Sequence, residues 1–226
     1  MNGSLPRFVI IPAAGSGSRM GNQLPKQFLL LNGMPVIVHT IKLFSEIISV
    51  EKIVVAVSVD WKNHFEELIK KHSLSEKIEV IEGGDRRFQS VKNALAVLPD
   101  EGLVSVHDAA RPLASKSLIE KCFSVAEEKG SAVAAIELKD SLYAFENGEA
   151  KNVSRNNFRL VQTPQCFKLS EIKKAFTQTF SEKFTDDASV YEAAAYKVNL
   201  VEGETTNIKI TTPEDLLFAE AMMKSK

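Results

Sequence analysis

The chain has little cysteine, almost no net charge and no long apolar run. Its two cysteines, Cys122 and Cys166, lack the CxxC spacing of a metal or redox site, so we expect two reduced, buried thiols. Lysine and arginine number 28 against 29 aspartate and glutamate, for a formal net charge of -1. This balance argues against a general binder of nucleic acid or of membrane surfaces.

The N-terminal apolar stretch is too short for a targeting or membrane segment. Residues 8–11 are followed by Pro12 and then by glycines, and no basic region precedes them. We therefore expect neither a signal peptide nor a membrane span, and we predict a cytoplasmic protein. With 226 residues, of which 44% are hydrophobic, the chain suits one α/β domain over residues 1–226.

Short β-branched runs alternate with amphipathic stretches along most of the chain. The predicted strands are 8–11, 52–59, 78–81, 103–107, 132–136, 198–201 and 208–210. The predicted helices are 36–44, 61–71, 87–98, 116–129, 169–179, 187–196 and one that begins at Thr212 and Pro213. This alternation predicts an α/β fold, with a mostly parallel, Rossmann-like sheet flanked by helices.

The alternation fails over residues 139–160, a polar segment with Asn147 and Gly148 at its centre. An Asn-Gly pair between extended arms indicates a β-hairpin. We expect this hairpin to protrude as an arm, toward a partner subunit or over a site. A surface excursion without a role is the alternative.

A loop rich in small residues follows the first predicted strand and runs from Pro12 to Gly21. Such a loop can bring backbone N–H groups close to phosphates. A P-loop is excluded because no lysine follows Gly17 or Gly21, and a dinucleotide fingerprint lacks its third glycine. A nucleotidyltransferase loop, in which Arg19 and Lys26 neutralise a triphosphate, fits the pattern. A dinucleotide loop and a simple turn remain alternatives.

Three further clusters come after predicted strands. Gly83 to Arg87, with Ser90, follows one strand and could hold a base or form a capped turn. His107 to Pro112 follows another, and there Asp108 and Arg111 could bind ligand or pair with each other. Lys209 lies within an apolar run, as a ligand-binding cation or a solvated edge residue.

These motifs, in this order, resemble those of the 2-C-methyl-D-erythritol 4-phosphate cytidylyltransferase family, which has the nucleotide-diphospho-sugar transferase fold. The resemblance runs from residue 8 to the last helix. It rests on PAAGSGSRMG at 12–21, PKQF at 25–28, GGDRR at 83–87 with Ser90, VHDAARP at 106–112, SR at 154–155, QTPQ at 162–165, TDDAS at 185–189 and EG with TNIKIT at 202–211.

The resemblance implies a role for each matching position. The implied catalytic residues are Arg19, Lys26, Arg155 and Lys209. The implied CTP-binding residues are Pro12, Ala13, Ala14, Gly15, Ser16, Gly17, Gly84, Asp85, Ser90, Asp108 and Ala109. The implied acceptor-binding residues are Asp108, Arg111, Ser141, Arg155, Thr163, Thr185 and Lys209. Ser141 stands where the family commonly has Thr, and Ser154 where Asp often precedes the arm arginine.

The implied reaction joins CTP and a methylerythritol phosphate with release of pyrophosphate. It needs no general base, because the acceptor phosphate is already an anion, so we do not expect His107 to be catalytic. The resemblance also implies Mg2+ held mainly by the CTP phosphates, no dedicated metal ligands in the protein, and a homodimer joined through the arm. A cytidylyltransferase for ribitol 5-phosphate or another polyol phosphate, and a non-catalytic nucleotide-binding regulator, remain alternatives.

Overall fold

The computed structural model describes residues 5–15 and 24–224. Its strands are β1 (Arg7–Pro12), β2 (Leu30–Leu31), β3 (Met34–Pro35), β4 (Val50–Val57), β5 (Ile78–Glu82), β6 (Leu103–Val106), β7 (Ser131–Glu137), β8 (Leu142–Glu146), β9 (Glu149–Val153), β10 (Arg159–Lys168) and β11 (Leu200–Glu202). Its α-helices are α1 (Val36–Ser45), α2 (Lys62–Lys71), α3 (Arg87–Ala96), α4 (Lys116–Lys129), α5 (Leu169–Ala175), α6 (Asp187–Ala193) and α7 (Pro213–Lys224). Short 3-10 turns are η2 (Lys26–Phe28), η3 (Val59–Trp61), η4 (Ser75–Lys77) and η5 (Arg155–Asn157).

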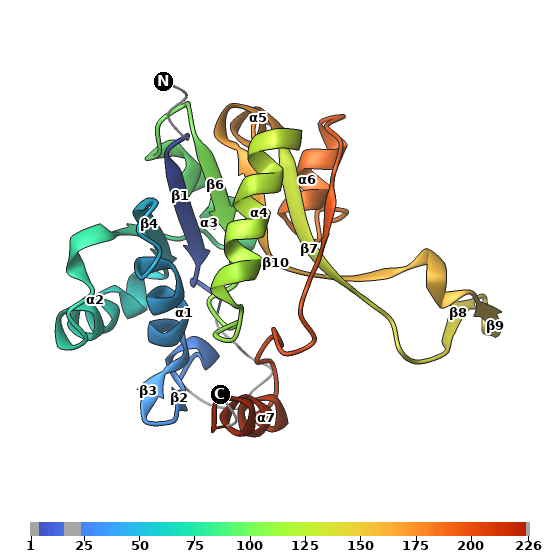
Figure 1. Cartoon of the computed structure of the whole chain (residues 1–226), viewed down its shortest axis with the longest axis horizontal. Helices are drawn as coiled ribbons and strands as arrows, with labels where there is room; N and C mark the ends of the chain where they lie inside the picture. Colours follow the sequence, from blue (N-terminus) through green and yellow to red (C-terminus); the bar gives the residue numbers. More distant parts are fainter. Residues whose placement is uncertain (1–4, 16–23, 225–226) are drawn as a thin grey trace.

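The central sheet has seven strands in the order β11-β7-β10-β6-β1-β4-β5 (Figure 1). Strands β6, β1, β4 and β5 are parallel neighbours, and β11 pairs in parallel with β7. Only β10 runs antiparallel to its neighbours among these seven. The predicted α/β fold with a mostly parallel sheet is confirmed.

Helices cover both faces of the sheet because its strands are apolar on both sides. Along β1, Val9 and Ile11 belong to one buried cluster, which includes residues of α1, α2 and α4. Phe8 and Ile10 point the other way, into a cluster with residues of α3, α5 and α6. This period-two division is typical of a parallel sheet buried between two helical layers. The carboxyl ends of β1, β4, β5 and β6 therefore share one edge.

The last helix, α7, packs at that end of the molecule, beside β2 (Figure 1). Ala219 of α7 and Ile210 ahead of it share a buried cluster with Leu31. The predicted start of the helix is confirmed: the Thr212 hydroxyl accepts a hydrogen bond from the Asp215 N–H at 3.3 Å. In return, the Asp215 carboxylate accepts one from the Thr212 N–H at 2.9 Å, which closes the first turn.

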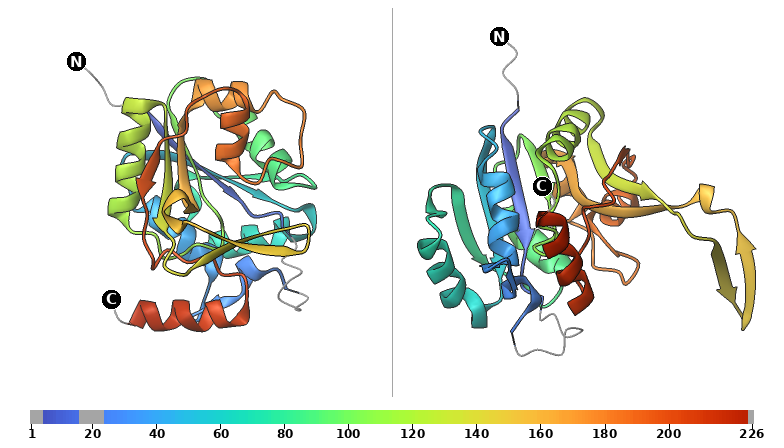
Figure 2. Two further views of the ribbon diagram at one scale, coloured as in Figure 1. Left: turned by 90° about the vertical axis from the view of Figure 1, so that its right-hand side faces the viewer. Right: turned by 60° about the horizontal axis from the view of Figure 1, so that its bottom comes forward.

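The predicted hairpin is confirmed and protrudes from the body of the molecule (Figures 1 and 2). Strands β8 and β9 pair from Leu142 opposite Val153 to Glu146 opposite Glu149. Asn147 and Gly148 both have positive φ, 51° and 84°, as a two-residue turn of this hand requires. Two connections attach this arm to the ends of β7 and β10.

The prediction of a strand at 208–210 is wrong. This segment forms no ladder with the sheet; Ile210 N–H instead donates to the Ala110 carbonyl at 2.9 Å. The alternation of Ile208, Lys209 and Ile210 arises because Ile210 is buried in the α7 cluster while Lys209 faces the site. An extended segment that buries every second side chain has the same alternation of apolar and polar residues as an edge strand, so the sequence does not separate the two.

Other boundaries also differ from expectation. Strand β10 was not predicted, because Pro164 and flanking polar residues interrupt its apolar pattern, and its pairing with β7 shifts register between Val161 and Gln165. Helices α5 and α6 end four and three residues earlier than predicted, at Ala175 and Ala193.

Both cysteines are free and buried, as predicted. Among the residues that the structure describes, no helix is long and apolar enough to cross a membrane.

Candidate active site

A cleft opens where β1, β5 and β6 end. We call it the loop cleft, because the start of the small-residue loop forms one wall. Its lining contains the predicted residues Pro12, Ala13, Ala14, Gly15, Lys26, Gly84, Asp85, Ser90, Asp108, Ala109 and Lys209, together with Gln27, Arg86, Arg87 and Ala110. Motifs that are far apart in the sequence therefore meet at one edge of the sheet.

A tight turn after β5 forms another wall of the loop cleft. A Cβ atom on Gly83 would lie 2.4 Å from Ala14 Cβ, so only glycine permits this close approach. The Ser90 hydroxyl accepts a hydrogen bond from the Gly84 N–H at 3.0 Å and lies 3.1 Å from the Arg86 carbonyl. Ser90 thus lines the cleft and also caps the turn, so the capped turn is confirmed and the binding of a base there stays a prediction.

A second cleft adjoins the first, and we call it the polar cleft. Its lining contains the predicted residues Asp108, Arg111, Thr163, Thr185 and Lys209, together with Arg87, Val161, Gln162, Gln165 and Asp186. The two clefts share Arg87, Asp108 and Lys209. A ligand in either cleft would therefore lie against the same three charged groups.

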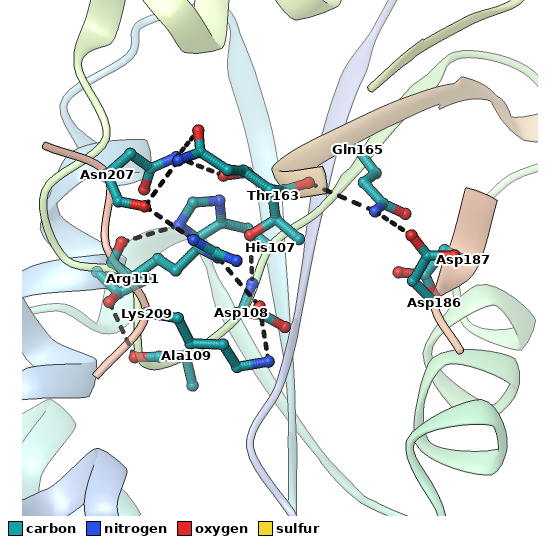
Figure 3. A network of polar contacts seen from close by, with 12 residues as sticks. His107, Asp108, Ala109, Arg111, Thr163, Gln165, Asp186, Asp187, Asn207 and Lys209 are labelled. Atoms are coloured by element: carbon teal, nitrogen blue, oxygen red, sulfur yellow. Dashed lines mark hydrogen bonds and ion pairs between the residues drawn. The ribbon is translucent and has the colours of Figure 1, made fainter. Parts of the chain in front are cut away.

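Asp108 is the centre of these charges, and Figure 3 shows it beside Lys209 and Arg111. Its Oδ2 lies 3.0 Å from Lys209 Nζ and 3.2 Å from Arg111 Nε, and its Oδ1 lies 3.7 Å from Arg87. Burial alone would raise the pKa of Asp108, but the three cations outweigh it and hold the pKa well below its usual range. The carboxylate is therefore ionised at neutral pH, and it gathers three cations around one point.

Two buried side-chain amides hold the segment that carries Lys209 (Figure 3). Asn207 Nδ2 donates to the Thr163 carbonyl at 2.8 Å and lies 3.3 Å from Gln162 Oε1. Gln162 Nε2 donates to the Glu204 carbonyl at 2.8 Å. The Asn207 carbonyl in turn accepts from Arg111 Nη1 at 2.8 Å. These bonds replace the ladder that the predicted strand would have made.

Some predicted residues lie elsewhere. Ser141 and Arg155 are exposed on the arm and line neither cleft; Arg155 donates a hydrogen bond to the Lys139 carbonyl. Arg19, Ser16 and Gly17 lie outside the described residues. Sequence reasoning missed Arg87, which pairs with Asp187 at 2.6 Å and lines both clefts. Its signal was present in the GGDRR motif, but nothing there distinguishes Arg87 from Arg86.

His107 precedes Asp108 but lines neither cleft. The ring is completely buried, lies edge-on to Phe44 at 5.0 Å, and its Nε2 lies 2.9 Å from the Arg111 carbonyl. In the described part of the chain its Nδ1 is buried with no hydrogen-bond partner. Burial lowers the pKa of His107 from 6.5 to about 4, so the ring is neutral. The contact with the Arg111 carbonyl links the two ends of this turn, and the absence of a catalytic role for His107 stays a prediction.

This buried ring predicts a pH dependence of stability. The unfolded chain binds a proton at His107 below about pH 6.5 and the folded chain only near pH 4, so stability falls as pH falls through that window. The drop in pKa corresponds to a loss on the order of 3 kcal/mol. We expect His107→Gln to remove this part of the pH dependence while kcat stays within about tenfold of wild type. Urea unfolding at pH 7 and pH 4.5 would measure it; a wild-type slope in the variant would contradict it.

The chain matches one enzyme family over almost its full length. Residues 8–225 match the family model described as 2-C-methyl-D-erythritol 4-phosphate cytidylyltransferase. A relative of that name from Bacteroides thetaiotaomicron is 40% identical over 215 residues, which cover 95% of this chain and 98% of the relative. Another, from Bacillus velezensis, is 40% identical over 222 residues, which cover 96% of each.

Solved structures agree with the sequence relatives. The 4-diphosphocytidyl-2C-methyl-D-erythritol synthase of Anaerococcus prevotii superposes with a TM-score of 0.84 at 27% identity, over 96% of each chain. The 2-C-methyl-D-erythritol 4-phosphate cytidylyltransferase of Thermus thermophilus gives 0.77 at 33% identity, over 96% of this chain and 98% of its own.

Proposed function

The chain belongs to the 2-C-methyl-D-erythritol 4-phosphate cytidylyltransferase family, and from this premise we propose which of its residues act in the reaction. Its members are nucleotidyltransferases that join CTP and 2-C-methyl-D-erythritol 4-phosphate in isoprenoid biosynthesis. CTP occupies the loop cleft and the acceptor phosphate the polar cleft. The observation that carries this assignment is the sharing of Arg87, Asp108 and Lys209 between the two clefts, which brings both ligands to one point.

The chemistry is an in-line transfer between two anions. An oxygen of the acceptor phosphate attacks the α-phosphorus of CTP, and the bond from that phosphorus to the bridging oxygen of the leaving pyrophosphate breaks. Because the nucleophile is already ionised near pH 7, no side chain has to remove a proton. The protein must instead overcome the repulsion between the two phosphates and stabilise charge on the transferring group. Lys26 and Lys209, which line the loop cleft, supply positive charge together with Arg19 of the small-residue loop, and Arg111, which lines the polar cleft, binds the acceptor phosphate.

Magnesium is part of the proposal as an ion that the CTP phosphates hold. Within residues 5–15 and 24–224, no three His, Cys, Asp or Glu side chains cluster as a metal site. Both oxygens of Asp108 face cations, so this carboxylate is a poor ligand while those contacts persist. A magnesium ion that keeps mostly phosphate and water ligands fits such surroundings, where it would neutralise phosphate charge.

We also propose a cytoplasmic location for the protein. Its two cysteines are free and buried, which agrees with a reducing compartment.

A second candidate function differs from the first only in the acceptor substrate. We expect pyrophosphate release when the protein is incubated with CTP, Mg2+ and 2-C-methyl-D-erythritol 4-phosphate, and much less with ribitol 5-phosphate. A preference for ribitol 5-phosphate would favour the alternative polyol phosphate enzyme. CTP binding without pyrophosphate release from any acceptor would favour a nucleotide-binding regulator.

We further propose that the protein is a homodimer in which the arm completes the partner's polar cleft. Two observations support this. Ser141 and Arg155 lie on the arm and line neither the loop cleft nor the polar cleft of their own chain. The arm and its base also expose large apolar side chains, among them Phe145 at 74%, Tyr143 at 60% and Leu160 at 52% exposed. Side chains of this kind are usually covered by a partner.

Mixed dimers test this arrangement. Lys26→Ala and Arg155→Ala should each be inactive alone, but a mixed dimer would contain one site with Lys26 from one chain and Arg155 from the other. Equal mixing should restore about one quarter of wild-type activity, since half of the dimers are mixed and each has one intact site. No recovery, despite subunit exchange shown by differently tagged chains, would mean that each site uses its own arm.

A further inference from the structure

Lys26 lies on a very short element. It begins the three-residue 3-10 turn η2, and neither a long helix nor a sheet strand carries it. A lysine has a long, flexible side chain, so the placement of its backbone decides which points in the loop cleft its ammonium can reach. Neighbouring side chains must therefore fix this turn.

Gln27, the next residue, ties the turn to the small-residue loop. Its side chain is 4% exposed, and Nε2 donates to the Ala13 carbonyl at 2.7 Å and to the Gly15 carbonyl at 3.1 Å. A primary amide has two N–H hydrogens, so both are used on these two carbonyls. Because Ala13 and Gly15 line the same cleft as Lys26, one side chain joins two of its walls.

The opposite side of the turn is held by aromatic packing. Phe28 is 2% exposed, and its ring centroid lies 5.3 Å from Trp61 and 5.2 Å from His64. The turn is thus fixed between the loop and the start of α2. Phe28 anchors it to the body of the protein, while Gln27 alone of these two reaches the loop.

We propose that Gln27 is a positioning residue, whose amide sets the distance between Lys26 and the loop that binds the triphosphate. The inference rests on the proposed function, in which Lys26 acts on the transferring group. Gln27 itself lines the loop cleft, but both of its N–H groups are used on protein carbonyls, so we expect its loss to act through the placement of Lys26. Misplacement by about 1 Å can lower a rate about 10²-fold while ground-state binding changes little.

Gln27→Glu is the sharpest test, because it keeps the shape and replaces the donor by an acceptor. A carboxylate facing two carbonyls repels both, so we expect kcat at pH 8 to fall about 10- to 100-fold, with a smaller change in KM for CTP. When protonated, the carboxyl can donate one of the two lost hydrogen bonds. The ratio of variant to wild-type kcat should therefore rise between pH 8.5 and pH 6. Gln27→Ala should lose kcat without this recovery.

Gln178 offers a matched control away from both clefts. Its Nε2 also donates to two backbone carbonyls, those of Ala175 at 2.8 Å and Val190 at 3.0 Å. Gln178→Glu should therefore affect thermal stability in a comparable way and leave kcat near that of wild type. An equal loss of kcat in both Gln→Glu variants, or a pH-independent ratio for Gln27→Glu, would overturn the proposal.

Two further measurements separate this proposal from the proposed function. If Gln27→Glu does not fold, Gln27→Ala decides, and a wild-type kcat in that variant overturns the inference. If Lys26→Ala is slow but Gln27→Ala is not, the role of Lys26 stands and the positioning role fails. If Lys26→Ala itself has wild-type kcat, the assignment of Lys26 fails first, and with it the inference.

Discussion

Replacing Lys26 with alanine is expected to lower kcat by about 10²-fold or more, with a much smaller loss of CTP affinity. Lys26 lines the loop cleft with Ala13, Gly15 and Lys209. In the proposed complex, the base and ribose of CTP would keep the backbone walls of that cleft when the lysine is removed. The charge on the transferring phosphoryl group develops only during the reaction, so its stabilisation is lost from the transition state more than from the bound complex.

Separate measurements of binding and turnover would check this result. CTP affinity can be followed by calorimetry without acceptor, and kcat by pyrophosphate release. Lys26→Arg keeps the positive charge but replaces the compact ammonium by a planar guanidinium group, so it should retain part of the activity. Lys62→Ala, at an exposed lysine of α2, is the matched control and should have wild-type kcat. A kcat for Lys26→Ala within about threefold of wild type would exclude a role in the transition state.

The location of the site followed from the sequence because parallel strands end at one edge of their sheet. Ala13 follows β1, Gly84 follows β5 and Asp108 follows β6, so these three motifs lie at the same edge of the sheet and meet in the loop cleft. The hairpin was equally predictable, since Asn147 and Gly148 carry a local turn signal that needs no tertiary contact.

What the sequence did not reveal depends on contacts between distant side chains. Gln162 and Asn207 form hydrogen bonds across 45 residues, and either could have been a surface amide. Arg87 and Arg86 also look alike in the sequence, and each pairs with a distant acid, but the partner of Arg87 is the buried Asp187 and that of Arg86 is the exposed Glu182. The error at 208–210 has this origin too. The side-chain amides of Gln162 and Asn207, and not a neighbouring strand, form the hydrogen bonds that hold the segment carrying Lys209.

Asp108 lines both clefts, and its replacement is the second substitution from which we expect a large loss of activity. Asp108→Asn keeps the shape of the side chain but removes the negative charge that faces Arg87, Arg111 and Lys209. Without it the three cations repel one another, and Lys209 loses its partner at 3.0 Å. We expect kcat/KM for the acceptor to fall about 10²-fold, because the cations that both phosphates meet are no longer held in place.

The same substitution should destabilise the fold in a pH-dependent way. Removing one partner of a buried ion pair costs about 3–5 kcal/mol, and since Lys209 is 40% exposed and Arg87 keeps Asp187, we expect about 2–3 kcal/mol at pH 7. The pKa of Asp108 is lower in the folded chain than in the unfolded one, so its contribution is complete above about pH 4 and is lost as pH falls further. The stability difference between wild type and Asp108→Asn in urea should therefore be constant from pH 7 to 5 and shrink below pH 4. A difference that stays constant below pH 4 would mean that the charge of Asp108, and so its gathering of the three cations, does not stabilise this site.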